Sequence, residues 1–135
     1  MKELRLILKK QFAKEILEGK KHREYRDYSG FYIQRLLDFG TENEQTVYCE
    51  NGIHFTPIHY DAIRFWWYSK EYLLVECKAW TVLTKGQCKD IKTPDGVSFY
   101  EMIRDEYDLE DAPDDYTFFL FELGKIIEDK SNIKI

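Results

Sequence analysis

A short helix that stops at a glycine and leads straight into a charged segment is the feature that most restricts the fold of this 135-residue chain. Ile16 and Leu17 end a stretch with helical spacing of apolar residues, and Gly19 follows two positions later. Glycine lacks a Cβ and therefore adopts, without steric cost, the left-handed conformation that closes many helices. Residues 20–26 must then turn back beside the helix. The pattern predicts a helix, a tight turn and a strand, in that order.

Apolar spacing divides the rest of the chain into strands and short helices. Strands are predicted over residues 3–8, 22–27, 46–50, 60–67, 71–83 and 116–123, the last of them central and buried. Helices are predicted over 11–18, from an N-cap at Ser29 to residue 38 with Gly40 as its stop, and over 97–107; a turn is predicted at 93–96 and a loop at 41–45. In the strand over 71–83, one face should carry Leu73, Val75, Cys77 and Ala79. This order predicts an α+β domain built round a small curled sheet.

The charge of the chain is unevenly distributed. The net charge of −5 argues against a general nucleic-acid coat protein, which would be basic. Residues 1–26 contain nine Lys and Arg against four Asp and Glu, whereas residues 27–135 contain eleven against twenty-one. Such asymmetry suits a local site for an anionic ligand on a body that repels anions. The aromatic content of 16% favours a β-rich fold with aromatic packing or stacking surfaces.

The cysteines indicate a reducing compartment. Cys49, Cys77 and Cys88 form no C-x-x-C pair, and no secretory apolar region precedes them, since lysines interrupt the apolar residues of 1–18. We therefore expect reduced thiols in a cytoplasmic protein. No run approaches the roughly 18 apolar residues that a membrane helix needs, so no membrane partner is expected.

A set of four residues that follows the first predicted helix forms a recognisable signature. Gly19-x-Lys21-x-x-Glu24-x-Arg26 matches the G-x-K-x-x-E-x-R pattern of the ASCH family, whose small β-barrel domains are similar to the PUA domains of RNA-modifying proteins. The resemblance implies a PUA-like small β-barrel with flanking helices over residues 1–127, and we expect a C-terminal tail over 128–135. It also implies a cleft between the first helix and the barrel, and a ligand that is RNA, a nucleotide or a modified nucleoside.

The side chains of the signature suit such a ligand. Glu24 and Arg26 lie two apart on a strand and therefore share a face. The fork of donors on Arg26 fits phosphate or a base edge, and Glu24 can accept from an exocyclic amine. Lys21, at the turn, would meet phosphate or carbonyl groups. The alternative is a Glu24–Arg26 pair that only holds the turn.

A second set of candidate binding residues lies in the strand over 60–67. Arg64 alternates onto the same face as Tyr60 and Trp66, which makes a cationic and aromatic surface able to stack a base. The alternative is that a tryptophan at this strand end closes the core. Glu76, on the next strand, would either line the ligand cleft or face water.

These residues predict a domain that binds RNA, a nucleotide or a modified nucleoside without a cofactor. No metal site is predicted, because Cys49, His54 and His59 are spaced by five, which matches no zinc motif.

Two alternatives to simple binding remain open. One is an amidohydrolase acting on acylated cytidine, as in a related ASCH branch, with Lys21 and Glu24 as its catalytic residues and Lys21 as the base. That branch has a threonine where this chain has Glu24, which removes the hydroxyl nucleophile. The other alternative is a regulatory protein-interaction module that uses the acidic segment 105–115.

Overall fold

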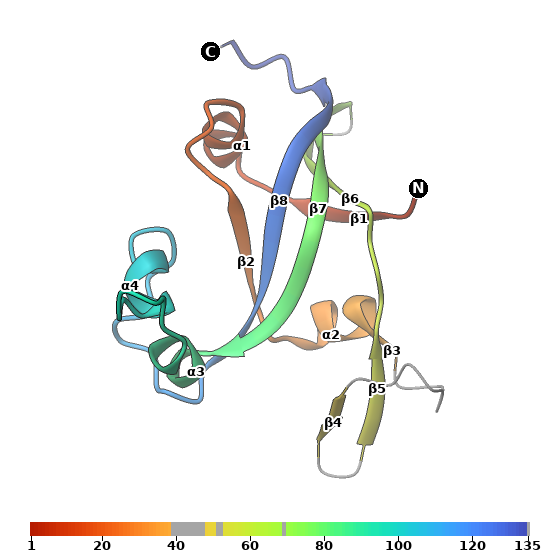
Figure 1. The fold of residues 1–135 in the computed structure, drawn as a ribbon. Helices are drawn as coiled ribbons and strands as arrows, with labels where there is room; N and C mark the ends of the chain where they lie inside the picture. The colour runs from red at the N-terminus through yellow and green to blue at the C-terminus, as the bar shows by residue number, and fades with distance from the viewer. Residues whose placement is uncertain (39–47, 51–52, 69, 135) are drawn as a thin grey trace.

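Five strands form one curled, mixed sheet at the centre of the molecule (Figure 1). In spatial order they are β1 (Glu3–Ile7), β6 (Ala62–Tyr68), β7 (Glu71–Thr84), β8 (Thr117–Lys130) and β2 (Arg23–Asp27). β1 runs parallel to β6, and the other neighbouring pairs are antiparallel. The sheet curls into a half-barrel with β1 and β2 at its two edges. This computed structural model describes residues 1–38, 48–50, 53–68 and 70–134.

Short helices connect and flank the strands, so the predicted α+β class is confirmed. α1 (Lys10–Leu17) joins β1 to β2 near one end of the half-barrel, whereas α3 (Lys85–Asp90) and α4 (Phe99–Ile103) lie toward the opposite end (Figure 1). α2 (Gly30–Leu36) follows β2 and leads into a smaller sheet. Its strands, in spatial order, are β3 (Leu37–Asp38), β5 (Ile53–Pro57) and β4 (Tyr48–Glu50).

The turn after α1 forms as the sequence predicts. Ala13 and Ile16 bury the apolar side of the helix in the core. Gly19 has a φ of 75°, and its N–H donates to the Ile16 carbonyl at 3.1 Å. The Lys20 N–H donates to the Glu15 carbonyl at 2.9 Å. These bonds satisfy carbonyl groups at the helix end and direct the chain into β2.

The core lies on both faces of β8. Phe119 and Phe121 pack into the larger apolar cluster, together with residues of β1, β6 and α1. Phe118 and Leu120 pack into a second cluster with residues of α3 and α4. Burial on both faces explains the continuous hydrophobic run in this strand and confirms its predicted central position.

Several element boundaries differ from the sequence-based expectation. β8 continues to Lys130, so residues 128–130 are strand rather than tail, and Ile133 packs against the larger cluster. The helix expected over 97–107 spans only Phe99–Ile103. α3 was not expected, although Thr84 and Gln87 form a capping box at its start. Three expectations concern residues outside the described ones: the loop over 41–45, the first two residues of the strand over 46–50 and the helix stop at Gly40.

The side-chain alternation of β7 changes partway along the strand. Leu73, Val75 and Cys77 are buried on one face as expected, but Ala79 is exposed and Trp80 packs against the larger cluster instead. The pairing with β8 shifts register between Val75 and Ala79. An extra residue in a strand reverses which side chains face the core, and alternation alone does not reveal it.

Candidate functional site

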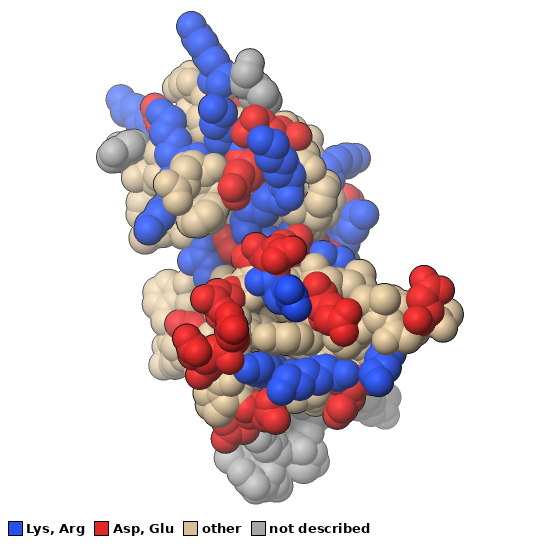
Figure 2. Space-filling model, turned by 90° about the vertical axis from the view of Figure 1, so that its left-hand side faces the viewer, with Lys and Arg blue, Asp and Glu red and all other residues tan. Residues whose placement is uncertain are grey.

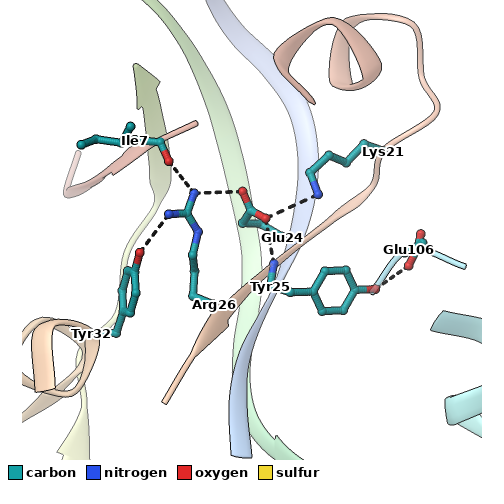
Figure 3. Close-up of polar contacts among 7 residues, drawn as sticks. All are labelled: Ile7, Lys21, Glu24, Tyr25, Arg26, Tyr32 and Glu106. Carbon is teal, nitrogen blue, oxygen red and sulfur yellow. Dashed lines mark hydrogen bonds and ion pairs between the residues drawn. The ribbon is translucent and has the colours of Figure 1, made fainter. Parts of the chain in front are cut away.

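The structure brings Lys21 and Arg26 together around the buried carboxylate of Glu24 (Figure 3). Glu24 Oε1 lies 3.4 Å from Lys21 Nζ, and Glu24 Oε2 lies 3.1 Å from Arg26 Nη2. Glu24 Oε1 also accepts the backbone N–H of Tyr25 at 2.9 Å. Each oxygen of the carboxylate therefore has at least one partner within the protein itself.

Arg26 crosses from one edge of the half-barrel to the other. Its Nη2 donates to the Ile7 carbonyl of β1 at 2.7 Å, and its Nη1 donates to the Tyr32 hydroxyl of α2 at 2.9 Å (Figure 3). Burial by itself would lower the pKa of Arg26, but the Glu24 carboxylate and the Tyr32 hydroxyl outweigh burial and raise this pKa above its ordinary value. Arg26 is thus a fixed, charged link between β2, β1 and α2.

Lys21 is held on the other side of Glu24. Its side chain is only 15% exposed. Its Nζ lies 5.8 Å from the ring centroids of both Phe12 and Tyr25. The Lys21 side chain therefore lies between the Glu24 carboxylate and two aromatic rings.

A cleft of about 700 Å³ lies beside this group, between α2, β1, β6 and the start of β7. We call it the α2 cleft. Among the described residues that line it, the cations outnumber the carboxylates; they are Arg5, Arg26, Arg35, Arg64 and Lys70, against Glu71. This concentration of positive charge in a concave site suits an anionic ligand.

Two of the arginines in the α2 cleft lie opposite each other in the sheet. Arg5 of β1 and Arg64 of β6 are register partners. Glu3 accepts from Arg64 Nε at 2.9 Å and from Arg64 Nη2 at 3.1 Å, and this hydrogen bonding lowers the pKa of Glu3. The Arg64 guanidinium also lies 4.0 Å from the centroid of the Tyr72 ring. Arg64 is therefore held flat and in place, whereas Arg5 makes no salt bridge within the described part of the chain.

Aromatic rings accompany the cations in the α2 cleft; those lining it are Phe31, Tyr32, Trp66 and Tyr72. Phe31 is 52% exposed and Trp66 is 36% exposed, which is unusual for such large apolar groups. The guanidinium of Arg35 lies 3.5 Å from the Phe31 ring centroid. Exposed rings beside cations provide surfaces on which a nucleobase can stack.

Three residues predicted from the sequence to bind ligand line the α2 cleft: Arg26, Arg64 and Trp66. Lys21 and Glu24 lie behind its lining and reach it only through Arg26. The α2 cleft is a different place from the cleft that the resemblance implies between the first helix and the barrel. The sequence did not indicate Arg5 or Arg35, because nothing in the pattern shows that α2 packs beside β1.

Tyr60 and Glu76 lie elsewhere. Tyr60 precedes β6, is buried in the larger cluster and donates its hydroxyl to the Arg35 carbonyl at 2.6 Å. Glu76 borders a separate hollow and accepts the backbone N–H of Lys125 at 3.3 Å. Tyr60 therefore anchors α2 through a hydrogen bond to its backbone, and Glu76 contributes to the contact between β7 and β8.

The acidic segment 105–115 is partly used within the fold. Glu106 accepts from Arg23 Nη1 at 3.3 Å and from the Tyr25 hydroxyl. Burial and this hydrogen bond raise the pKa of Tyr25 well above its ordinary value. Figure 2 shows Asp and Glu side chains mixed with Lys and Arg over the part of the surface where α3 and α4 lie, whereas Lys and Arg dominate over α1.

Comparison of the chain with models of protein families, with curated proteins and with solved structures finds no match. Within the described residues, none of the helices has the length and apolar character that crossing a membrane requires.

Proposed function

We propose that the chain binds a nucleotide, free or within RNA, in the α2 cleft. The observation that carries this proposal is the combination of several arginines and exposed aromatic rings in one cavity of about 700 Å³. Nucleotides pair an anionic phosphate with a flat, stackable base, and single-stranded RNA is bound by this same combination of cations and rings.

Each wall of the cleft has a role in this proposal. Arg5 and Arg35, which are exposed, meet phosphate. Trp66 offers its ring to the base. Arg64 and Arg26 are held by carboxylates and by neighbouring hydroxyl or ring groups, so they present a fixed positive surface without being reorganised on binding.

The family resemblance gives this proposal independent support. We propose that the chain is a PUA-like domain of the ASCH family, on the strength of the Gly19–Arg26 signature and of a half-barrel with flanking helices. A cytoplasmic location fits the free, buried thiols of Cys77 and Cys88.

Hydrolysis is not part of the proposal. A general base must lie within hydrogen-bond reach of its substrate, yet Lys21 is paired with Glu24 and does not line the α2 cleft. Both oxygens of Glu24 are engaged by Lys21, Arg26 and the Tyr25 N–H.

Titration calorimetry with each of the four nucleoside 5′-monophosphates and with a four-nucleotide RNA of each base tests the proposal. Loss of a stacking surface in Trp66→Leu should weaken binding about tenfold or more. Arg104→Gln, which alters an exposed arginine on the α4 side of the molecule, should leave affinity unchanged. Absence of saturable binding by every nucleotide, or equal affinity in Trp66→Leu, would contradict the proposal.

A further inference from the structure

Some of the positively charged side chains in the α2 cleft form a salt bridge with a carboxylate, and others form none within the described residues. Arg64 is paired with Glu3, and Arg26 is paired with Glu24. Glu71, the first residue of β7, pairs with Lys10 at 3.9 Å, whereas Lys70 makes no salt bridge among the residues that the structure describes. Arg5 and Arg35 line the same cleft, and neither makes a salt bridge within the described part of the chain.

The two arginines without a salt bridge in the described residues, Arg5 and Arg35, come from different sides of the cleft. Arg5 projects from β1 opposite Arg64, and like charges directly opposite each other destabilise a sheet. Glu3 forms its hydrogen bonds with Arg64 and also attracts Arg5 through its charge, so one carboxylate serves two guanidinium groups. Arg35 comes from α2, where its Nη1 donates to the Phe31 carbonyl of its own helix and its guanidinium lies 3.5 Å from the Phe31 ring centroid. Two guanidinium groups in one cleft, neither in a salt bridge with a carboxylate of the described part of the chain, mark a site for an external anion.

We infer that the α2 cleft takes a nucleotide with a terminal phosphomonoester, and that Arg5 and Arg35 share the charge of this group. A phosphomonoester carries a charge of about −1.5 to −2 at pH 7, because its second pKa is about 6. A phosphodiester inside an RNA strand carries a single charge. Two guanidinium groups without a salt bridge in the described part of the chain therefore match a nucleoside monophosphate, or the phosphorylated end of an RNA, better than an internal phosphate. This inference rests on the proposed function and specifies the ligand of the same site.

The second ionisation of phosphate gives the inference a pH signature. Between pH 7.5 and pH 5 a monoester loses most of its second negative charge, whereas a diester does not change. Groups of the chain around the cleft that could titrate on their own account are Glu3, Glu24, Tyr32, Lys70, Glu71 and Tyr72. A change in their charge acts on both ligands but more strongly on the doubly charged monoester, so the diester, whose own charge stays constant, serves as the reference for the effect of pH on the protein.

The experiment compares uridine, uridine 5′-monophosphate, the diester UpU and inorganic phosphate by titration calorimetry at pH 7.5 and pH 5, and repeats the series with adenosine ligands. The monophosphate should bind about tenfold or more tightly than the diester at pH 7.5, and this preference should shrink severalfold at pH 5. Arg5→Gln and Arg35→Gln should each reduce affinity for the monophosphate about tenfold while leaving affinity for the nucleoside unchanged. Arg104→Gln should match the unmodified protein.

The possible failures separate the inference from the proposed function. Equal binding of the diester and the monoester, with no pH effect on their ratio, would overturn the inference and leave nucleotide binding intact. Inorganic phosphate that binds as tightly as the nucleoside monophosphates would overturn it as well, because the base would then contribute nothing. If no nucleoside, nucleotide or dinucleotide binds, both the inference and the proposed function are wrong.

Discussion

Glu24 is a carboxylate with 8% exposure that touches Lys21 on one side and Arg26 on the other. A buried charge between two partners is costly to leave unpaired but contributes little net stability when paired. Its effect here is geometric, because Arg26 in turn fixes the Ile7 carbonyl of β1 and the Tyr32 hydroxyl of α2. The signature residues thus position the walls of the α2 cleft more than they form its surface.

Glu24→Gln tests this role at the residue scale. The neutral amide keeps the shape of the side chain but leaves two cations without their counter-charge, so the free energy of unfolding should fall by about 2–4 kcal/mol. Urea denaturation followed by fluorescence measures it. Glu101→Gln, at an exposed position of α4, should change stability by less than about 0.5 kcal/mol. A Glu24→Gln protein as stable as the unmodified one would show that this carboxylate does not hold the edge strands.

At the scale of elements, the connection from α1 to β2 depends on one backbone conformation. Gly19 has a φ of 75°, and a Cβ added there would meet no atom within 4 Å. The cost of Gly19→Ala is therefore backbone strain alone, about 1–2 kcal/mol. Gly30, the first residue of α2, also has open space but no positive φ, so Gly30→Ala should be neutral or stabilise by up to about 1 kcal/mol. Thermal unfolding of both variants measures the contrast, and similar shifts for the two would refute the strained-turn explanation.

The Glu3–Arg64 pair, which links β1 to β6, should make the free energy of unfolding depend on pH in the acid range. The hydrogen bond from Arg64 lowers the pKa of Glu3 in the folded protein, so the contribution of Glu3 to stability is present above its ordinary pKa of 4.5 and is lost as pH falls through the lowered value. Glu3→Gln should remove this part of the acid sensitivity, and the stability of the variant should fall less steeply between pH 5 and pH 3. Chemical denaturation at several pH values measures the slope. An unchanged slope would contradict the link between this pair and acid stability.

Elements with strong local signals were predictable, and the packing between them was not. The glycine stop after Leu17 defined α1 and the start of β2, and the apolar run from Phe118 to Phe121 identified a central strand. The register shifts between Val75 and Ala79 left no trace in the composition of β7, so the exposure of Ala79 was missed. The site shows the same division: alternation identified Arg64 and Trp66 as neighbours, whereas Arg5 and Arg35 meet only because the sheet curls and places α2 beside β1.

At the scale of the whole molecule, the net charge of −5 opposes any extended contact with a polyanion. Figure 2 shows Asp and Glu mixed with Lys and Arg over α3 and α4, and mainly Lys and Arg over α1. Among the residues that the structure describes, few cations of the α2 cleft lack a salt bridge; they are Arg5, Arg35 and Lys70. A long RNA can therefore gain only a small number of phosphate contacts while the rest of the surface repels it.

This balance predicts how RNA affinity responds to salt. With about two or three phosphate contacts, the logarithm of the association constant for single-stranded RNA should fall with the logarithm of salt concentration with a slope of about −1.4 to −2.1. Fluorescence anisotropy of a labelled RNA at several salt concentrations measures the slope, and lengthening the RNA beyond the cleft should not make it steeper. Arg5→Gln should make the slope shallower by about 0.7, because one contact is lost, whereas Arg104→Gln should not alter it. Tight binding that is insensitive to salt, or a slope that grows with RNA length, would mean that RNA is held by a surface other than the α2 cleft.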